Sequence, residues 1–118
     1  MSNMATTQLW AATSVPKSTG VTSAAVDVSK LVRGSLNILV LTGVNPDFTY
    51  TYTLSNSLAG TYVEPITLST GTDWEDLTAV DVLDFIPEAS RYIKIVATSN
   101  NAVNAVALTA SLSVQELM

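Results

Sequence analysis

The chain of 118 residues contains neither cysteine nor histidine. Without cysteine there is no disulfide framework, no thiolate nucleophile and no thiolate metal ligand. Histidine is the side chain most often used as a general base or zinc ligand near neutral pH, so its absence argues against hydrolases and metalloenzymes together. We therefore expect a protein that is not an enzyme, with no catalytic residues, no metal and no cofactor.

Charge is also scarce: charged residues make up 13% of the chain and hydrophobic residues 47%, whereas about 25% charged residues is usual. The net charge is −5, and the five basic residues are Lys17, Lys30, Arg33, Arg91 and Lys94. They are too scattered to follow a phosphate backbone, so no nucleic-acid partner is expected. A chain with so little charge predicts a surface covered by copies of itself or by a larger assembly, the alternative being a monomer with a Ser/Thr-rich exterior.

The first residues, Met1 to Thr7, lack the basic and long apolar stretches of a signal peptide. No apolar run approaches the roughly 20 residues that a membrane-spanning helix needs. We therefore expect no membrane association and synthesis in the cytoplasm. Because residues 1–7 are small or polar and uncharged, we predict that they form an N-terminal arm that packs on a neighbouring copy.

Threonine and valine supply 30 of the 118 residues, and β-branched side chains favour a pleated sheet over a helix. The clearest period of two runs from Phe48 to Leu54, and a first strand is expected from Leu9 to Val15 before Pro16. Turn residues recur every 8 to 12 positions. The pattern predicts a single all-β domain over residues 1–118, an antiparallel β-sandwich of jelly-roll type with about eight strands and little or no helix.

Two strands carry information about surfaces. The run from Leu36 to Leu41 is apolar on both faces apart from Asn37, so it is either a central strand covered on both sides or a strand whose second face lies at a subunit interface. The chain closes with a hairpin of 91–97 and 106–114, whose last strand has an apolar face and a small, uncharged face formed by Ala107, Thr109, Ser111 and Ser113. Such a face is typical of a surface that meets another protein.

The stretch from Asp73 to Glu88 holds six of the ten acidic residues. Carboxylates in this number suggest Ca²⁺, but the spacing of the known ion loops is absent, which favours a solvated acidic loop and leaves ion binding open. Within the stretch, Val80 and Val82 predict a strand with a bulge at Leu83. A helical turn through Trp74 and Leu77 is the alternative.

Most aromatic residues occupy strand positions that point inward, and Phe48, Tyr50, Tyr52 and Phe85 are therefore expected in the core. The two tryptophans differ, because Trp10 is out of phase with its neighbours and Trp74 lies among acids. Each is either a core residue, an anchor for a partner or a platform for a sugar. The candidate interface residues are Met4, Leu9, Trp10, Trp74, Thr109, Ser111 and Ser113.

The order of several segments resembles that of the small cement or decoration proteins of tailed-bacteriophage capsids. The likeness is carried by residues 7–13, 24–29, 55–66 and 91–95 and by the closing Ala-Leu-Thr-Ala-Ser-Leu-Ser-Val strand. It implies a β-sandwich or jelly roll that binds the major capsid protein on the outside of the capsid lattice, as a homo-oligomer such as a dimer or trimer, and stabilises the head of the virion. The family has no catalytic residues.

The strand Arg91-Tyr92-Ile93-Lys94-Ile95 also resembles, more weakly, that of discoidin-like sugar-binding sandwiches. A carbohydrate-binding or host-attachment module is therefore the alternative function. A structural component of the phage tail or neck is a third, since it would share the composition of a head protein.

Overall fold

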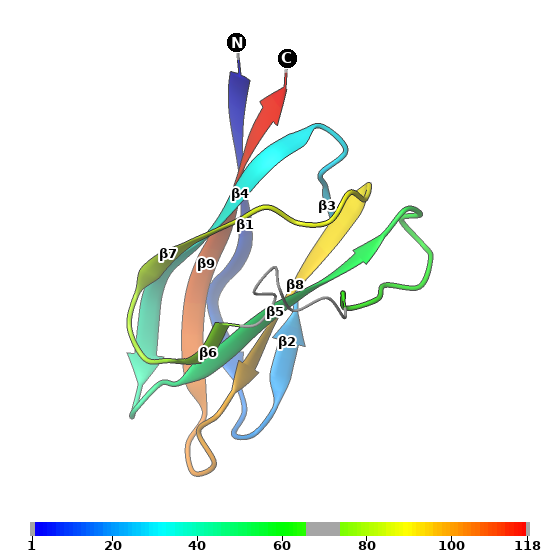
Figure 1. Ribbon diagram of the computed structural model, residues 1–118. Helices are drawn as coiled ribbons and strands as arrows, with labels where there is room; N and C mark the ends of the chain where they lie inside the picture. The colour runs from blue at the N-terminus through cyan, green and yellow to red at the C-terminus, as the bar shows by residue number, and fades with distance from the viewer. Residues whose placement is uncertain (1, 66–73, 118) are drawn as a thin grey trace.

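The computed structural model describes residues 2–65 and 74–117, which form two antiparallel sheets packed face to face (Figure 1). These residues contain nine strands and no helix, and the ninth is added by the two-residue β3, so the prediction of an antiparallel β-sandwich with about eight strands is confirmed. The strands are β1 (Ser2–Val15), β2 (Gly20–Thr22), β3 (Val26–Asp27), β4 (Leu31–Gly43), β5 (Phe48–Ser55), β6 (Trp74–Leu77), β7 (Asp81–Phe85), β8 (Tyr92–Ser99) and β9 (Val106–Leu117).

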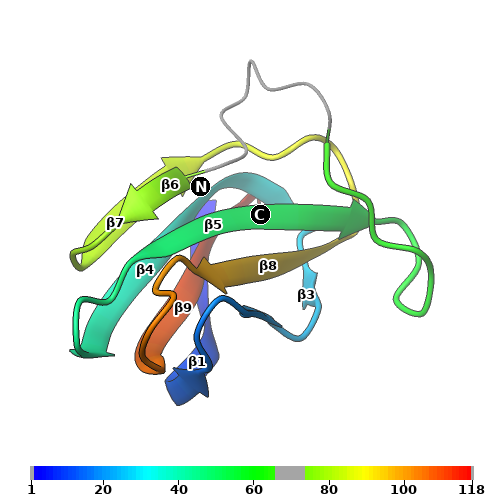
Figure 2. The same cartoon turned by 90° about the horizontal axis from the view of Figure 1, so that it is seen from below.

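One sheet, the four-stranded sheet, has the order β1-β9-β4-β7. The other, the five-stranded sheet, has the order β2-β8-β5-β6, with β3 also paired to β8. Figure 2 shows the two layers almost end on, with β5 and β8 lying across β9 and β1. Strands β1 and β9 pair from Ser2 opposite Leu117 to Val15 opposite Val106, so the two ends of the chain lie side by side.

The N-terminal segment is not a free arm in this structure. Residues 2–7 pair with residues 112–117 of β9 in the same chain, and β1 begins at Ser2 instead of at Leu9. Residues 2–7 are therefore the first half of an edge strand, and their packing on a neighbouring copy stays a prediction. The sequence concealed this pairing because the partner strand lies at the opposite end of the chain.

The core lies between the sheets and contains the aromatic residues expected there. Phe48, Tyr50 and Tyr52 are no more than 1% exposed, and Phe85 from β7 packs against Tyr52 with 5.2 Å between ring centroids. Trp10 is also in this core, at 6% exposure, so it is no anchor for a partner. The alternation along β5 thus predicted its buried residues correctly, whereas the position of Trp10 in the alternation of β1 did not show that it is buried.

Strand pairing decides two local questions in the acidic stretch. The helical turn that was the alternative at Trp74 does not form, because residues 74–77 pair with β5 as β6. No bulge occurs at Leu83, because β7 pairs with β4 without a shift of register. The short strands β2 and β3 are separated by the buried Ser23, whose Oγ accepts the Ile95 N–H and donates to the Ala24 carbonyl.

The short segment between β3 and β4 is a turn. The Ser29 N–H and hydroxyl both donate to Oδ1 of Asp27, at 2.9 and 2.7 Å, and the Leu31 N–H donates to the carbonyl of Val28. The two hydrogen bonds from Ser29, with smaller contributions from the charges of Arg91 and Lys30, lower the pKa of Asp27 below its usual value. The turn delivers the chain directly into β4.

Candidate functional site

The outer face of the four-stranded sheet is the surface that turns away from the core. It is formed by the outward side chains of β1, β9, β4 and β7, and its centre consists of small uncharged residues: Thr6, Ser35, Asn37, Thr109, Ser111 and Ser113. Alternation places them there, because their neighbours along β4 and β9, among them Leu36 and Leu112, are fully buried on the inner side. The uncharged face predicted from the closing strand is therefore the middle of a wider surface.

Hydrogen bonds across the strands join these side chains into a polar ladder. Asn37 Nδ2 donates to Ser113 Oγ at 3.0 Å and to Ser111 Oγ at 3.4 Å, and Ser113 Oγ lies 3.0 Å from Thr6 Oγ1. At the other end, Thr109 Oγ1 accepts the Ala12 N–H at 2.8 Å. Ser111 is only 7% exposed as a result of this close packing. The ladder holds the side chains in place, so covering this face orders few additional rotamers.

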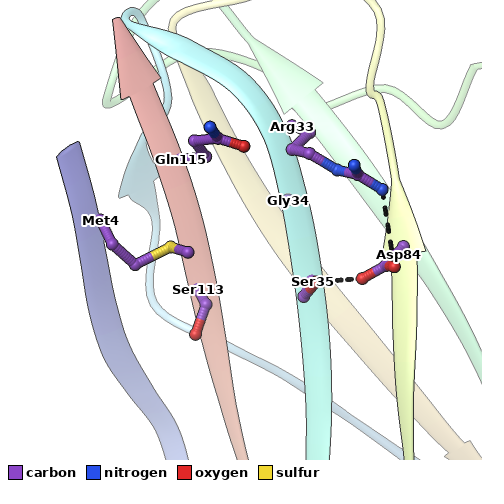
Figure 3. Close-up of a pocket in the computed structure, with 7 residues that line it drawn as sticks. All are labelled: Met4, Arg33, Gly34, Ser35, Asp84, Ser113 and Gln115. Atoms are coloured by element: carbon purple, nitrogen blue, oxygen red, sulfur yellow. Dashed lines mark hydrogen bonds and ion pairs between the residues drawn. The ribbon is translucent and has the colours of Figure 1, made fainter. Parts of the chain in front are cut away.

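A polar hollow of about 250 Å³ lies at one end of the face (Figure 3). Arg33 and Asp84 form an ion pair there, with 3.5 Å between Nη2 and Oδ2, and the Ser35 hydroxyl also donates to Asp84. Met4 from β1 lies on the opposite wall (Figure 3) and is 65% exposed. Because both charges are more than half exposed, the ion pair contributes well under about 1 kcal/mol to stability. The two charges compensate each other, so the hollow is polar without net charge.

A second hollow of about 480 Å³ lies on the same face, against Asn37 and Ser111 of the polar ladder, and Asp81 also lines it. Its aliphatic wall consists of Leu39, Val80 and Val82, which are 53%, 57% and 58% exposed. Leu39 is the extra residue of a β-bulge in β4, since Ile38 pairs with Ala110 and Val40 already with Thr109. The bulge leaves both Leu39 and Val40 exposed and gathers apolar side chains on the outer face.

The opposite outer face, on the five-stranded sheet, is partly covered by the chain itself. Lys94 on β8 lies over the ring of Tyr62 at 4.2 Å, and the Thr51 hydroxyl donates to Oε1 of Glu64 at 2.8 Å. Val63 pairs with Leu54 as an isolated bridge. Among residues 2–65 and 74–117, no comparable segment lies over the polar ladder. The four-stranded sheet therefore has the more open outer face.

The structure divides the seven candidate interface residues into two groups. Met4, Thr109, Ser111 and Ser113 lie together on the outer face of the four-stranded sheet. The other three pack against the core: Leu9, Trp10 and Trp74. Trp74 contacts two aromatic rings, with centroid distances of 5.3 Å to Phe85 and 6.4 Å to Tyr52. The tryptophans are thus structural residues of the sandwich.

Sequence reasoning raised the β4 part of the face only as an alternative, in which the second face of residues 36–41 lies at a subunit interface, and it missed the part contributed by β7. Asn37 was noted only as a break in an apolar run, yet it is the donor at the centre of the polar ladder. A signal was present, because Ser35 and Asn37 alternate with the buried Leu36 and Ile38. The position of Val82 beside Asn37 had no such signal, since it depends on the pairing of β4 with β7.

The acidic residues of the described part of the chain form no candidate metal site. No three acidic side chains there are arranged to hold an ion, and Asp73 together with the side chains of Glu75 and Asp76 lies outside the described residues. Burial raises the pKa of Tyr50 well above its usual value. The Tyr52 hydroxyl donates to Oε1 of Glu88 at 2.8 Å, a bond within the sandwich.

Comparison with known proteins gave no match, either to a family model or to a curated protein. Over the residues that the structure describes, no helix is of the length and apolar character needed to span a membrane.

Proposed function

We propose that the protein is a non-enzymatic structural protein of a bacteriophage particle, a decoration protein that binds the major capsid protein on the exterior of the capsid. The observation that carries the proposal is the outer face of the four-stranded sheet, which is open, ordered and uncharged at its centre, where Asn37 and Ser113 are hydrogen-bonded. The resemblance of the strand segments to decoration proteins gives the class of partner. The protein is made in the host cytoplasm and acts on the virion.

The size of the face suits a specific protein interface. Strands β1, β9 and β4 have 14, 12 and 13 residues and β7 has 5. At about 3.4 Å per residue and about 4.8 Å between strands, the face presents about 700 Å². A stable interface buries about 800 Å² per partner, so this face with its loops at either end approaches the standard size.

The centre of the face and its two hollows contribute to binding in different ways. The polar ladder already satisfies much of its own hydrogen bonding, so its removal from water leaves few unpaired groups. Leu39, Val80 and Val82 supply the apolar area that drives association. The Arg33–Asp84 pair lies in the polar hollow and contributes orientation. Together, the ladder and the two hollows form a surface suited to bind a folded protein whose own surface carries few charges.

Binding would stabilise the capsid by mass action. A ligand that binds only the assembled lattice contributes RT ln(1 + [L]/Kd), which is about 2.7 kcal/mol per site at a hundredfold excess over Kd. No catalytic step and no conformational change is needed. Repetition over the many equivalent sites of a lattice makes the total large even when each site binds modestly.

We assign the sandwich to the jelly-roll type, the finer fold expected from the sequence. In support, the first strand lies beside the last, and the chain crosses between the sheets after every strand except β2 and β5, in the orders β1-β9-β4-β7 and β2-β8-β5-β6. If β2 and β3 are counted as one interrupted strand, eight strands lie in two four-stranded layers, as in a double Greek key. An experimental structure of the virion would test this assignment together with the binding face.

The two alternative functions are less well supported. Carbohydrate binding was motivated by Trp10 and Trp74, but Trp10 is 6% exposed and Trp74 is partly buried against the core. A tail or neck component would use a similar surface at another place on the particle. Electron microscopy of particles carrying a labelled copy of this protein distinguishes head from tail by location alone.

The stabilising role is tested by heating particles that lack the protein, with and without added protein, and following the release of DNA. We expect decorated particles to rupture at a higher temperature, in proportion to the sites occupied. Sedimentation of the particles with bound protein provides the control for occupancy. Equal rupture temperatures at full occupancy would refute the stabilising role, and failure of the protein to bind would refute the capsid partner.

A further inference from the structure

Strand β1 is a long, unprotected edge of the four-stranded sheet. One side pairs with β9, and no strand of the described residues pairs with the other. From Ser2 to Gln8 the pairing is regular, because both shifts of register come later, between Gln8 and Trp10 and between Trp10 and Thr13. Residues 4–8 are all exposed. The first half of β1 thus presents a straight row of free backbone N–H and C=O groups.

The other described edges carry the features that normally prevent strand pairing. Strand β7 has Asp81 and Asp84 among its five residues, and β6 has two acidic residues among its four. Strands β2 and β3 are only three and two residues long. By contrast, the chain has no charged residue before Lys17. The difference in protection singles out residues 2–8.

We propose that residues 2–8 of β1 pair antiparallel with the same segment of a second copy of this chain. A second copy is inferred as the partner because residues 2–8 carry no charged side chain. Two copies that each carry a net charge of −5 repel one another, and a two-fold interface brings every side chain close to its own counterpart. Any edge with a carboxylate would therefore oppose self-association. The first half of β1 is the long edge where two copies meet without this cost.

The geometry of such a pair is defined by the regular segment. Use of all seven residues requires the two-fold axis to pass beside the midpoint, so that Ala5 faces Ala5 and Met4 faces Thr6 of the other copy. Alternation then keeps Met4, Thr6 and Gln8 on the outer face in both copies. The two four-stranded sheets would become one continuous sheet of eight strands. The uncharged outer face is thereby doubled in length on a single rigid body.

This inference deepens the oligomeric part of the proposed function, but it uses the edge of the sheet and not its outer face. The two ideas therefore fail separately. A protein that self-associates through β1 but binds no capsid keeps the inference and refutes the proposed function. A protein that binds capsids as a monomer does the reverse.

The test is the mass of the purified full chain by sedimentation, for the wild type and for Ala5→Glu and Ala5→Lys. The wild type should have the mass of a dimer, twice 12.5 kDa or about 25 kDa. Each variant alone should weaken self-association at least about tenfold, because like charges would face each other across the axis. An equimolar mixture of the two variants should restore a dimer with one copy of each. Circular dichroism establishes that both variants are folded.

Val103→Glu and Val103→Lys are the matched controls. Val103 is 76% exposed in the loop between β8 and β9, and these changes should leave the mass of the dimer unaltered. A second measurement is hydrogen exchange, in which the amides of residues 2–8 should gain protection with rising concentration in the wild type and not in Ala5→Glu.

Three results would overturn the inference. One is a wild-type mass of 12.5 kDa at every concentration accessible to sedimentation. Another is an oligomer whose mass is the same in the wild type and in Ala5→Glu. The third is a monomer whose amides at residues 2–8 become protected only on addition of capsid shells, which would assign the edge to a capsid subunit.

Discussion

Two tyrosines on β5, two residues apart and on the same face, should respond in opposite ways to the same change. Tyr50 and Tyr52 are 0% and 1% exposed. The Tyr52 hydroxyl donates to Oε1 of Glu88 at 2.8 Å, whereas the Tyr50 hydroxyl is buried with no hydrogen-bond partner among the described residues. Replacement of each by phenylalanine removes one oxygen and keeps the ring.

The expected magnitudes follow from this difference. A hydrogen bond to a charged group contributes about 1.5–3 kcal/mol, and Tyr52→Phe leaves a partly buried carboxylate without that donor. The free energy of unfolding should therefore fall by about 2 kcal/mol. Burial of an unpaired hydroxyl costs about 1–3 kcal/mol in proteins, so Tyr50→Phe should leave stability unchanged or raise it by up to about 1 kcal/mol.

The assay is urea and thermal unfolding followed by far-ultraviolet circular dichroism. For a domain of this size about 1 kcal/mol corresponds to about 4 °C in Tm, so Tyr52→Phe should lower Tm by about 8 °C. A double-mutant cycle with Glu88→Gln should give a coupling energy of about 1 kcal/mol or more. If Tyr50→Phe lost as much stability as Tyr52→Phe, or if the cycle gave no coupling, the assignment of these two hydroxyls would be refuted.

Three further predictions concern the sandwich. Gly43→Ala should lower the free energy of unfolding by about 1–3 kcal/mol, because Gly43 has φ of 110° and an added Cβ would lie 3.2 Å from Val106; unchanged urea unfolding would contradict this. Ser23→Ala should cost about 1–3 kcal/mol through the buried Ile95 N–H that loses its acceptor, with Ser57→Ala in an exposed loop as a milder comparison. Burial raises the pKa of Tyr50 on folding, so the free energy of unfolding should fall as the pH rises above 10, where the tyrosine of the unfolded chain loses its proton. Tyr50→Phe should flatten this alkaline loss of stability, and equal alkaline curves would argue against the reasoning.

The parts of the fold that depend on local alternation could be predicted from the sequence. Strand β5 and residues 106–114 of β9 present one buried and one polar set of residues, and Phe48, Leu108 and Leu112 are no more than 1% exposed. A strand of this kind requires only its own period and a core to face. The all-β class and the uncharged face of β9 follow from the same signal.

Strand β1 shows why the remainder could not be predicted. One extra residue lies between Gln8 and Trp10, and a second lies between Trp10 and Thr13. The first bulge turns Trp10 toward the core, and the second returns the later residues to their original phase, so that Val15 is fully buried. In the sequence, the alternation from Leu9 to Val15 is unbroken except for Trp10. Bulges depend on the partner strand and leave no period of their own.

Only part of the candidate site could be predicted from the sequence, for a related reason. Thr109, Ser111 and Ser113 were found because they share one strand. Leu39 and Val82 come from strands that meet only through long-range pairing, and the exposure of Leu39 depends on the bulge in β4. Patterns within a strand are readable from the sequence, whereas neighbours across strands depend on register.

The central claim is that the outer face of the four-stranded sheet binds the capsid, and co-sedimentation with capsid shells tests it most directly. The double variant Leu39→Lys, Val82→Lys places two charges at exposed positions of that face, 53% and 58% exposed, so it should fold normally. Val103→Lys is the control away from the face. We predict that the double variant binds shells at least about tenfold more weakly than the wild type and that the control binds equally well. Equal binding by all three proteins would contradict the account.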